Sequence, residues 1–229
     1  MPLTDAEWEA LRLSLAVALR SVLFSLPFAI LVAWLLTRRR FVGRTVFDAF
    51  VHLPLVLPPV VVGYVLLLVF GTRGAVGGWL DRELHIQLVF TRAGAALATA
   101  VMTFPMMVRA IRISLETVDR GLEDAARTLG AGPVDRFLTI TLPLMFPGIL
   151  AGAVTAFSAG LGEFGAVITF VSNIPGETRT LPIALYTALQ TPNGDAIAAR
   201  LAAISFALGL AGLLLSEVFA RYLRQRLGR

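Results

Sequence analysis

The feature that most constrains this chain is a set of five long apolar stretches. They lie near residues 12–36, 50–70, 93–115, 146–171 and 197–222. About 20 apolar residues in a helix span the hydrocarbon core of a bilayer, and a content of 57% hydrophobic and 15% charged residues does not suit an ordinary soluble domain. Open strands are excluded because lipid offers no partner to unpaired backbone groups. We therefore predict an all-α, polytopic membrane protein with five transmembrane helices, in a single domain over residues 1–229.

All 20 basic residues are arginines, and their distribution predicts the orientation of the chain. Thirteen would lie on one side of the membrane: after the first stretch, around the loop that follows the third stretch, and at the C-terminus. Seven would lie on or near the other side. Because cytoplasmic loops carry an excess of Lys and Arg, we expect the N-terminus outside and the C-terminus in the cytoplasm. An odd number of spans satisfies this arrangement.

The chain lacks the residues that most enzymatic chemistry requires. It has no Cys, no Lys and only two His. The phosphate-binding loop G-x-x-x-x-G-K-[ST] needs a Lys, metal clusters need Cys or several His, and no set of residues for nucleophilic catalysis is present. No basic patch with interleaved aromatic residues indicates nucleic-acid binding. We expect no catalytic site, no metal or other cofactor bound by this chain, and no nucleic-acid partner.

A polar segment at residues 119–143 separates the third and fourth stretches. Asp119 is placed to cap a short helix whose first turn carries acidic residues. Gly130 falls where a helix end favours a left-handed residue, and a second short helix can start soon after it. The predicted product is a helix–bend–helix that projects from the membrane with Leu122 and Leu129 exposed.

The same segment resembles the cytoplasmic loop by which permease subunits of ABC importers dock into their ATP-hydrolysing subunit. The pattern D/E-A-A-x3-G-x9-I-x-L-P is matched at Asp124, Ala125, Ala126, Gly130, Ile140, Leu142 and Pro143. Asp124 departs from the usual Glu of the first position, and Glu123 stands just before it. The resemblance implies that these residues, with Glu123, couple the chain to a separate ATPase that holds ATP and Mg²⁺. The alternative is a structured linker between two spans.

The second stretch contains Leu-Pro-Leu-Val-Leu-Pro-Pro, with prolines at Pro54, Pro58 and Pro59. Proline removes a backbone donor and clashes with the preceding turn, so we predict a kinked or broken helix. At membrane depth, freed carbonyl groups are tolerated where they face protein or a water-filled cavity. Two interpretations stay open: a hinged helix that lines a transport pathway, and a kink that serves packing alone.

Glu163 is the one ionisable residue near the middle of a predicted span, with Gly162 and Gly165 close by. A carboxylate there costs about 2.5–3.5 kcal/mol on insertion scales, so it should face the protein interior. The glycines allow close helix contact or a bent backbone. We expect a protonated or hydrogen-bonded structural role at a gate rather than contact with cargo. Nearer the C-terminus, Glu217 and Arg221 are spaced for an ordinary i, i+4 ion pair.

A turn-rich loop at residues 172–182 follows the fourth stretch and would lie outside. Four of its residues are candidate contacts for a partner on that side: Asn173, Pro175, Glu177 and Arg179. A short helix over residues 183–190 should follow the loop, capped by Thr180.

Three stretches resemble the molybdate branch of the importer permeases: Gly-Glu-Phe-Gly-Ala around Glu163, the proline-rich run, and the outer loop. The resemblance covers almost the whole chain and implies a type I ABC importer permease in the bacterial cytoplasmic (inner) membrane. It implies a homodimer with the transport path at the interface, two cytoplasmic ATPase subunits, and a periplasmic molybdate-binding protein that docks outside. Molybdate, with tungstate, would be the cargo.

Two alternatives remain open from the sequence. Permeases for sulfate or thiosulfate belong to the same family and are generally longer. A membrane-embedded enzyme or signalling subunit would be a different class of protein, and it would require clustered intramembrane His, Asp or Glu, which the sequence lacks.

Overall fold

The structure is a computed structural model that describes residues 3–226, without the side chains of residues 216, 217 and 219–226. All regular structure in this range is helical, which confirms the all-α fold class. The predicted Glu217–Arg221 pair lies outside the described side chains. The helices are α1 (Asp5–Arg38), α2 (Arg44–His52), α3 (Pro59–Phe70), α4 (Gly77–Leu84), α5 (Arg92–Glu116), α6 (Arg120–Thr128), α7 (Pro133–Arg136), α8 (Leu142–Leu161), α9 (Gly165–Val171), α10 (Leu181–Leu189) and α11 (Asp195–Arg226), with a 3₁₀ turn η1 (Leu53–Leu55) and a π-helical segment η2 (Phe137–Thr141).

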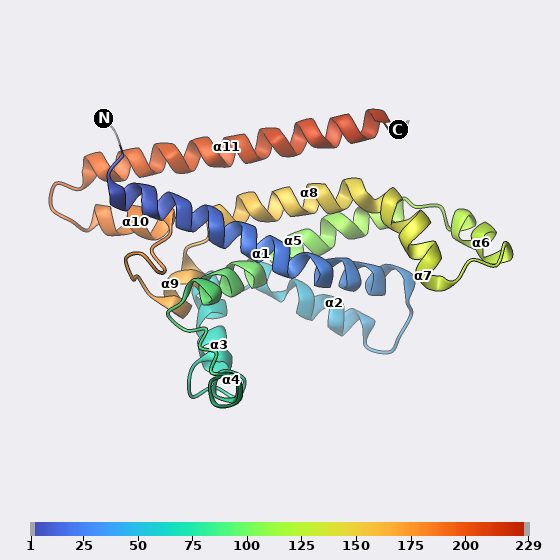
Figure 1. The fold of residues 1–229 in the computed structure, drawn as a ribbon, viewed down its shortest axis with the longest axis horizontal. Coiled ribbons are helices and arrows are strands. Elements are labelled where there is room, and N and C mark those ends of the chain that lie inside the picture. The colour runs from blue at the N-terminus through green and yellow to red at the C-terminus, as the bar shows by residue number, and fades with distance from the viewer. Residues whose placement is uncertain (1–2, 227–229) are drawn as a thin grey trace.

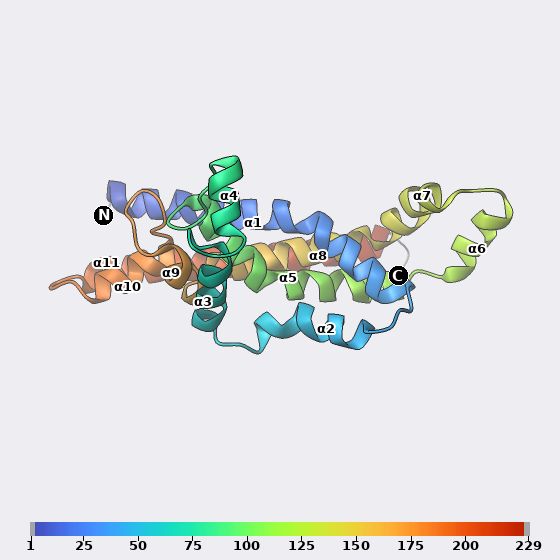
Figure 2. The same cartoon turned by 90° about the horizontal axis from the view of Figure 1, so that it is seen from below.

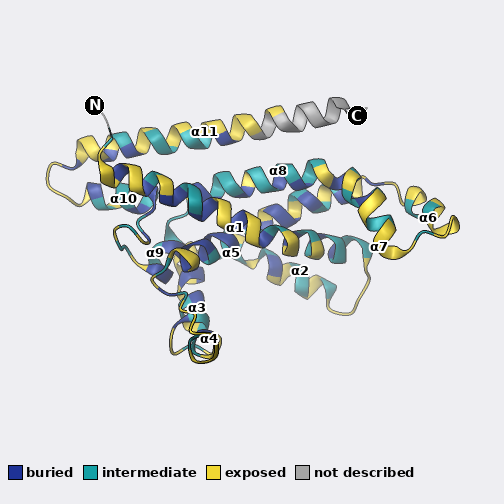
Figure 3. Cartoon of the chain, in the orientation of Figure 1, coloured by how far each residue is buried: buried dark blue, intermediate teal, exposed yellow. Residues whose placement is uncertain are grey.

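Three long helices, α1, α5 and α8, pack along one another and form the centre of the molecule (Figure 1). Among the long apolar helices, α5 is the most buried, whereas α11 lies on the outside with much of its surface exposed (Figure 3). Small residues let α5 and α8 approach closely: a Cβ added at Gly152 would lie 3.2 Å from the Cβ of Ala110. Helices in lipid gain little from the hydrophobic effect, so such close contact is the usual source of their association.

Four helical stretches are long and apolar enough to cross a membrane: α1, α5, the continuous run Pro133–Leu161, and α11 over Asp195–Leu215. The second apolar stretch is broken, because α2 with η1 and then α3 meet at a bend of 112°. The break comprises residues 56–58, ends at Pro58 and confirms the predicted interruption of this helix. Counted as one span, the bent pair brings the number to five. Figures 1 and 2 show α2 running along the bundle and α3 running across it.

The fourth predicted stretch, 146–171, is not one helix. α8 ends at Leu161 and α9 begins at Gly165, with a short break between them. Glycines are poor helix formers, and the Glu163 carboxylate accepts a hydrogen bond from the backbone N–H of Ala166 at 3.0 Å, which favours a new helix start. At its other end, α8 continues back through η2 into α7, so the helical run begins at Pro133.

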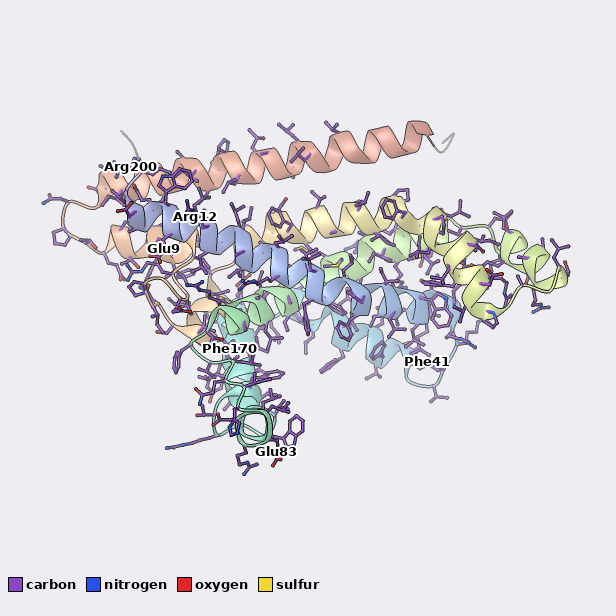
Figure 4. All side chains as sticks on the ribbon, in the orientation of Figure 1. Glu9, Arg12, Phe41, Glu83, Phe170 and Arg200 are labelled. Atoms are coloured by element: carbon purple, nitrogen blue, oxygen red, sulfur yellow. The ribbon has the colours of Figure 1, made fainter. Side chains whose placement is uncertain are left out.

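α1 is attached to neighbouring helices near its start. Its first turn is fixed by a capping box in which Thr4 and Glu7 bond to each other's backbone N–H. The buried carboxylate of Glu7 then accepts from the Nε of Arg200 on α11 at 3.0 Å, and Figure 4 shows Arg200 beside this end of α1. The hydroxyl of Ser14 accepts from the backbone N–H of Leu181, the first residue of α10, at 2.7 Å. These contacts hold α1, α10 and α11 together.

Candidate functional site

The segment that carries α6 and α7 projects beyond the end of the bundle (Figures 1 and 2). We call residues 119–143 the projecting loop. α6 begins at a cap, because Asp119 Oδ1 accepts from the N–H of Gly121 at 2.8 Å. It ends in a Schellman motif: the N–H of Ala131 donates to the Ala126 carbonyl at 3.0 Å, and Gly130 has a φ of +91°. The predicted helix–bend–helix, its cap and its left-handed glycine are confirmed.

Glu123 faces the bundle and anchors the projecting loop to it. Its Oε1 accepts from the Nη2 of Arg38 at 3.0 Å and from the hydroxyl of Thr141 at 2.8 Å. Arg38 also donates to the carbonyl oxygen of Val118 at 3.4 Å. Thr141 is buried at the end of η2. Glu123 therefore binds residues of its own chain. Within the predicted coupling set, its role is to position α6.

Arg38 holds the projecting loop to α1, whereas the sequence alone marks it only as one of the arginines that predict orientation. It stands 85 positions from Glu123, and a single sequence holds no signal that pairs residues so far apart. The side chain of Arg38 is 9% exposed. An arginine buried to this degree almost always has a charged or polar partner, so its burial, once known, would have indicated one.

The exposed surface of α6 comes from other residues, some of them in the same pattern. Asp124 and Ala125 are exposed on α6, and Leu122 and Leu129 are exposed large apolar side chains, Leu129 to 88%. The rest of the predicted coupling set lies elsewhere: Ala126 is half-buried, Ile140 and Leu142 are half-buried in η2 and at the start of α8, and Pro143 is exposed at the start of α8. The pattern thus divides between exposed residues on α6 and residues in η2 and at the start of α8.

Two of the candidate pathway residues, Pro59 and Gly165, come together where two broken helices meet. α3, which begins at Pro59, packs against α9, which begins at Gly165. A Cβ added at Gly165 would lie 2.8 Å from the Cβ of Pro59, and one at Gly63 would lie 2.6 Å from the carbonyl oxygen of Ala166. Pro58 is the residue before α3, and Pro54 lies in η1 just before the bend. Gly162 and Glu163 form the break before α9.

The outer loop is held in shape by two of its four candidate residues. The Nε of Arg179 donates to the Asn173 side-chain oxygen at 2.7 Å, and the Asn173 amide donates to the Thr187 hydroxyl on α10 at 2.9 Å. Pro175 and Glu177 are exposed, and Glu177 forms an exposed ion pair with Arg92 of α5 at 3.4 Å. The short helix is present as α10 (Leu181–Leu189).

The predicted cap of α10 is wrong in its chemistry. Thr180 occupies the capping position, but its hydroxyl is buried without a hydrogen-bond partner among the described residues. The first turn of α10 contains Pro182, which offers no backbone N–H. The Ser14 hydroxyl supplies the acceptor instead, because it bonds the N–H of Leu181.

A cavity of about 580 Å³ lies between α2 and the C-terminal end of α5, from which the projecting loop continues. Its charged and titratable lining residues are Asp48, His52, Arg109, Arg112 and Glu116. The Nη1 of Arg112 donates to both carboxylate oxygens of Asp48 at 3.0 Å, and His52 Nδ1 lies 3.1 Å from Asp48 Oδ1. The Arg112–Asp48 ion pair therefore connects α2 to the C-terminal part of α5.

Comparison with known proteins gives one family. The family described as "Binding-protein-dependent transport system inner membrane component" matches residues 25–229. The chain is 60% identical over 229 residues to the molybdenum transport system permease protein ModB of Escherichia coli (strain K12), with all of both chains covered. It is 51% identical over 223 residues to ModB of Haemophilus influenzae, with 97% of each chain covered. The sulfate transport system permease protein CysT of Escherichia coli (strain K12) is 37% identical over 202 residues, which are 87% of this chain and 73% of that one.

Solved structures give the same fold. A bacterial alginate ABC transporter in complex with an alginate pentasaccharide-bound periplasmic protein matches with a TM-score of 0.72 at 20% identity, over 98% of this chain and 80% of that chain. An amino acid ABC transporter matches with a TM-score of 0.63 at 18% identity, over 97% of this chain and 100% of that chain. These likenesses show the fold of ABC importer permeases.

Proposed function

We propose that this chain, which belongs to the family of inner-membrane components of binding-protein-dependent transport systems, is the membrane subunit of an ATP-driven molybdate importer. The single observation that supports molybdate as the cargo is the 60% identity to a molybdenum transport permease over the full length of both chains. The related sulfate permease is a second candidate, but it is 37% identical over part of its length. Tungstate, a close analogue of molybdate in size and charge, should share the path.

A second copy of the chain should complete the path. The face formed by α2, α3 and the turn between them carries large exposed apolar side chains, such as Phe50, Val56, Val60 and Tyr64. It adjoins the charged cavity between α2 and α5. Lipid would suit the apolar side chains but not the charged ones. Two copies that meet on this face would cover the apolar residues and enclose the charged cavity in a shared, hydrated channel.

The energy would come from two cytoplasmic ABC ATPase subunits that bind the projecting loops. The exposed apolar side chains of Leu122 and Leu129 form a small apolar surface on α6 that is suited to a protein partner. The chain contains no Lys and therefore no phosphate-binding loop of its own. In this scheme ATP and Mg²⁺ are held by the ATPases, and the permease itself has no catalytic role.

On the other side, a periplasmic molybdate-binding protein would dock on the outer loops. The exposed Pro175 and Glu177 lie in a loop that Asn173 and Arg179 hold to α10. A preformed loop of this kind loses little conformational entropy on binding. The projecting loop then lies in the cytoplasm and the N-terminus outside, the orientation that the arginine distribution indicates.

Transport by purified components tests the proposal. The permease, its ATPase and its binding protein are reconstituted in vesicles, and radiolabelled molybdate is followed after ATP is supplied on the ATPase side. We expect ATP-dependent accumulation that tungstate inhibits well and sulfate poorly. If the complex takes up sulfate but not molybdate, the sulfate assignment is correct. If an assembled complex takes up neither oxyanion, both assignments are wrong.

A further inference from the structure

A cavity of about 770 Å³ lies between the second half of α1 and the projecting loop. We call it the α1–α6 cavity. On the α1 side its wall is apolar, from Pro27, Ile30, Leu31 and Trp34. At the other end its lining includes five arginines: Arg38, Arg39, Arg120, Arg127 and Arg136. The cavity is therefore amphipathic along its length, with a basic end and an apolar end.

The basic end has more positive charge than the protein neutralises. Of the two lining carboxylates, Glu123 is already bound by Arg38 and Thr141, which leaves Asp124 to face the remaining arginines. The Nε of Arg38 is buried and has no hydrogen-bond partner among the described residues. An unpaired donor on a buried guanidinium is costly. Both observations indicate that an anionic acceptor from outside the chain belongs at this end.

We propose that the α1–α6 cavity binds an anionic phospholipid, with its phosphate among the arginines and one acyl chain along the apolar wall. A free oxyanion such as phosphate or molybdate would suit the basic end, but it would leave the apolar wall uncovered. Leu31 is 58% exposed on a helix long and apolar enough to span the membrane, so lipid reaches this wall from the side. Anionic headgroups are enriched in the cytoplasmic leaflet and attract basic segments near its surface.

This site would connect membrane composition to the projecting loop. The lipid would touch α1 and α6 at once, beside the Arg38–Glu123 bond that holds α6 to the bundle. The choice of leaflet depends on the proposed orientation, whereas the presence of a lipid site does not. Binding can therefore be measured without any transport assay, and a wrong cargo or a wrong orientation would leave the result unchanged.

Two neighbouring arginines provide a matched test. Arg39 lines the cavity, and Arg40 is exposed and does not line it. Permease–ATPase complexes are purified from nanodiscs of phosphatidylcholine with phosphatidylglycerol, and the phospholipids retained are counted by native mass spectrometry. We expect Arg39→Gln to reduce phosphatidylglycerol retention about fivefold, the effect of one basic residue near an anionic surface, and Arg40→Gln to leave it unchanged. Equal loss in both variants would overturn the site, because it would show only general surface attraction.

A second pair of measurements separates lipid from free anion. Leu31→Trp narrows the apolar wall and keeps every arginine, so we expect it to reduce phosphatidylglycerol retention, and it serves as an independent test if Arg39→Gln fails to assemble. Inorganic phosphate and molybdate are titrated into delipidated complex as competitors. The proposal fails if Leu31→Trp leaves lipid retention unchanged, or if either free anion binds at the arginines with the apolar wall empty.

Discussion

The guanidinium of Arg38, at the end of α1, lies 3.0 Å from the carboxylate of Glu123 on α6, and the two residues are 85 positions apart. This bond fixes the projecting loop to the helical bundle, and Thr141 completes it from η2. The inner side of the loop is therefore bonded to the membrane helices, while its outer side is exposed.

The first prediction concerns that bond. Glu123→Ala should leave Arg38 buried with a lost partner, at a cost of about 1–3 kcal/mol, and should loosen the loop. We expect the variant to insert in the membrane but to retain less ATPase on co-purification. Glu116→Ala is the matched control, since Glu116 is mostly exposed and pairs with Arg112 only at 3.5 Å. This variant should lose about 0.5 kcal/mol or less of folding stability. Normal ATPase retention by Glu123→Ala would show that the bond does not position α6.

The second prediction tests the bend after α6. Gly130 has a φ of +91° and open space where a Cβ would stand, whereas Gly132 has equally open space and a φ of −67°. Gly130→Val should therefore cost about 1–2 kcal/mol from backbone strain alone and should reduce binding-protein-stimulated ATP hydrolysis by the reconstituted complex. Gly132→Val adds the same side chain without that strain and should retain activity. Full transport by Gly130→Val would indicate that the loop is only a linker.

The third prediction concerns Glu163. Its carboxylate accepts the Ala166 N–H at the start of α9, and an amide oxygen can make the same bond, so Glu163→Gln should transport at near-normal rates. Glu163→Leu leaves that N–H without its acceptor, at about 1–3 kcal/mol, and should reduce uptake. The comparison is made by initial uptake rates at matched protein levels. If Glu163→Gln reduces uptake as much as Glu163→Leu does, the negative charge itself is required and the hydrogen-bonded structural role is wrong.

The fourth prediction concerns the contact between α3 and α9. Gly63→Ala would place a Cβ 2.6 Å from the carbonyl oxygen of Ala166, so α3 must shift, and the detergent-purified protein should unfold at a lower temperature. Gly209→Ala in α11 meets nothing within 4 Å and should be neutral or stabilising by about 0.5–1 kcal/mol. Equal melting temperatures for the two variants would mean that α3 is not held against α9.

The fifth prediction concerns orientation. The chain has no native Cys, so single cysteines can be labelled without background. Thr128→Cys in the projecting loop should react with a membrane-impermeant thiol reagent only from the cytoplasmic side, and Thr72→Cys, exposed after α3, only from outside. External labelling at position 128 would reverse the topology and place the loop away from any cytoplasmic ATPase.

The sequence predicted the features that depend on local chemistry. The break at the prolines, the cap at Asp119 and the left-handed Gly130 follow from backbone preferences, and the structure confirms them. The resemblance to molybdate permeases is confirmed by identity over the full chain. The predictions for the coupling, pathway and outer-loop residues concern partners and cargo, and they remain predictions.

Features that depend on tertiary contact were missed. The acceptor at the start of α10 comes from Ser14, 167 positions away, so Thr180 was the reasonable but wrong choice. Hydropathy could not show that α8 stops at Leu161, because the residues on both sides of the break are equally apolar. Nor could it separate Glu123, which binds Arg38, from Asp124, which is exposed and has no such bond to α1 among the described residues.

α1 is fastened at both of its ends, by Glu7 to Arg200 and by Arg38 to Glu123. Its 34 residues measure about 50 Å at 1.5 Å per residue, which is enough to cross the bilayer. A displacement of α6 relative to α11 therefore either moves α1 or bends it. Pro27 lies inside α1, where a missing hydrogen bond makes bending easiest, so we expect α1 to bend there when α6 moves relative to α11.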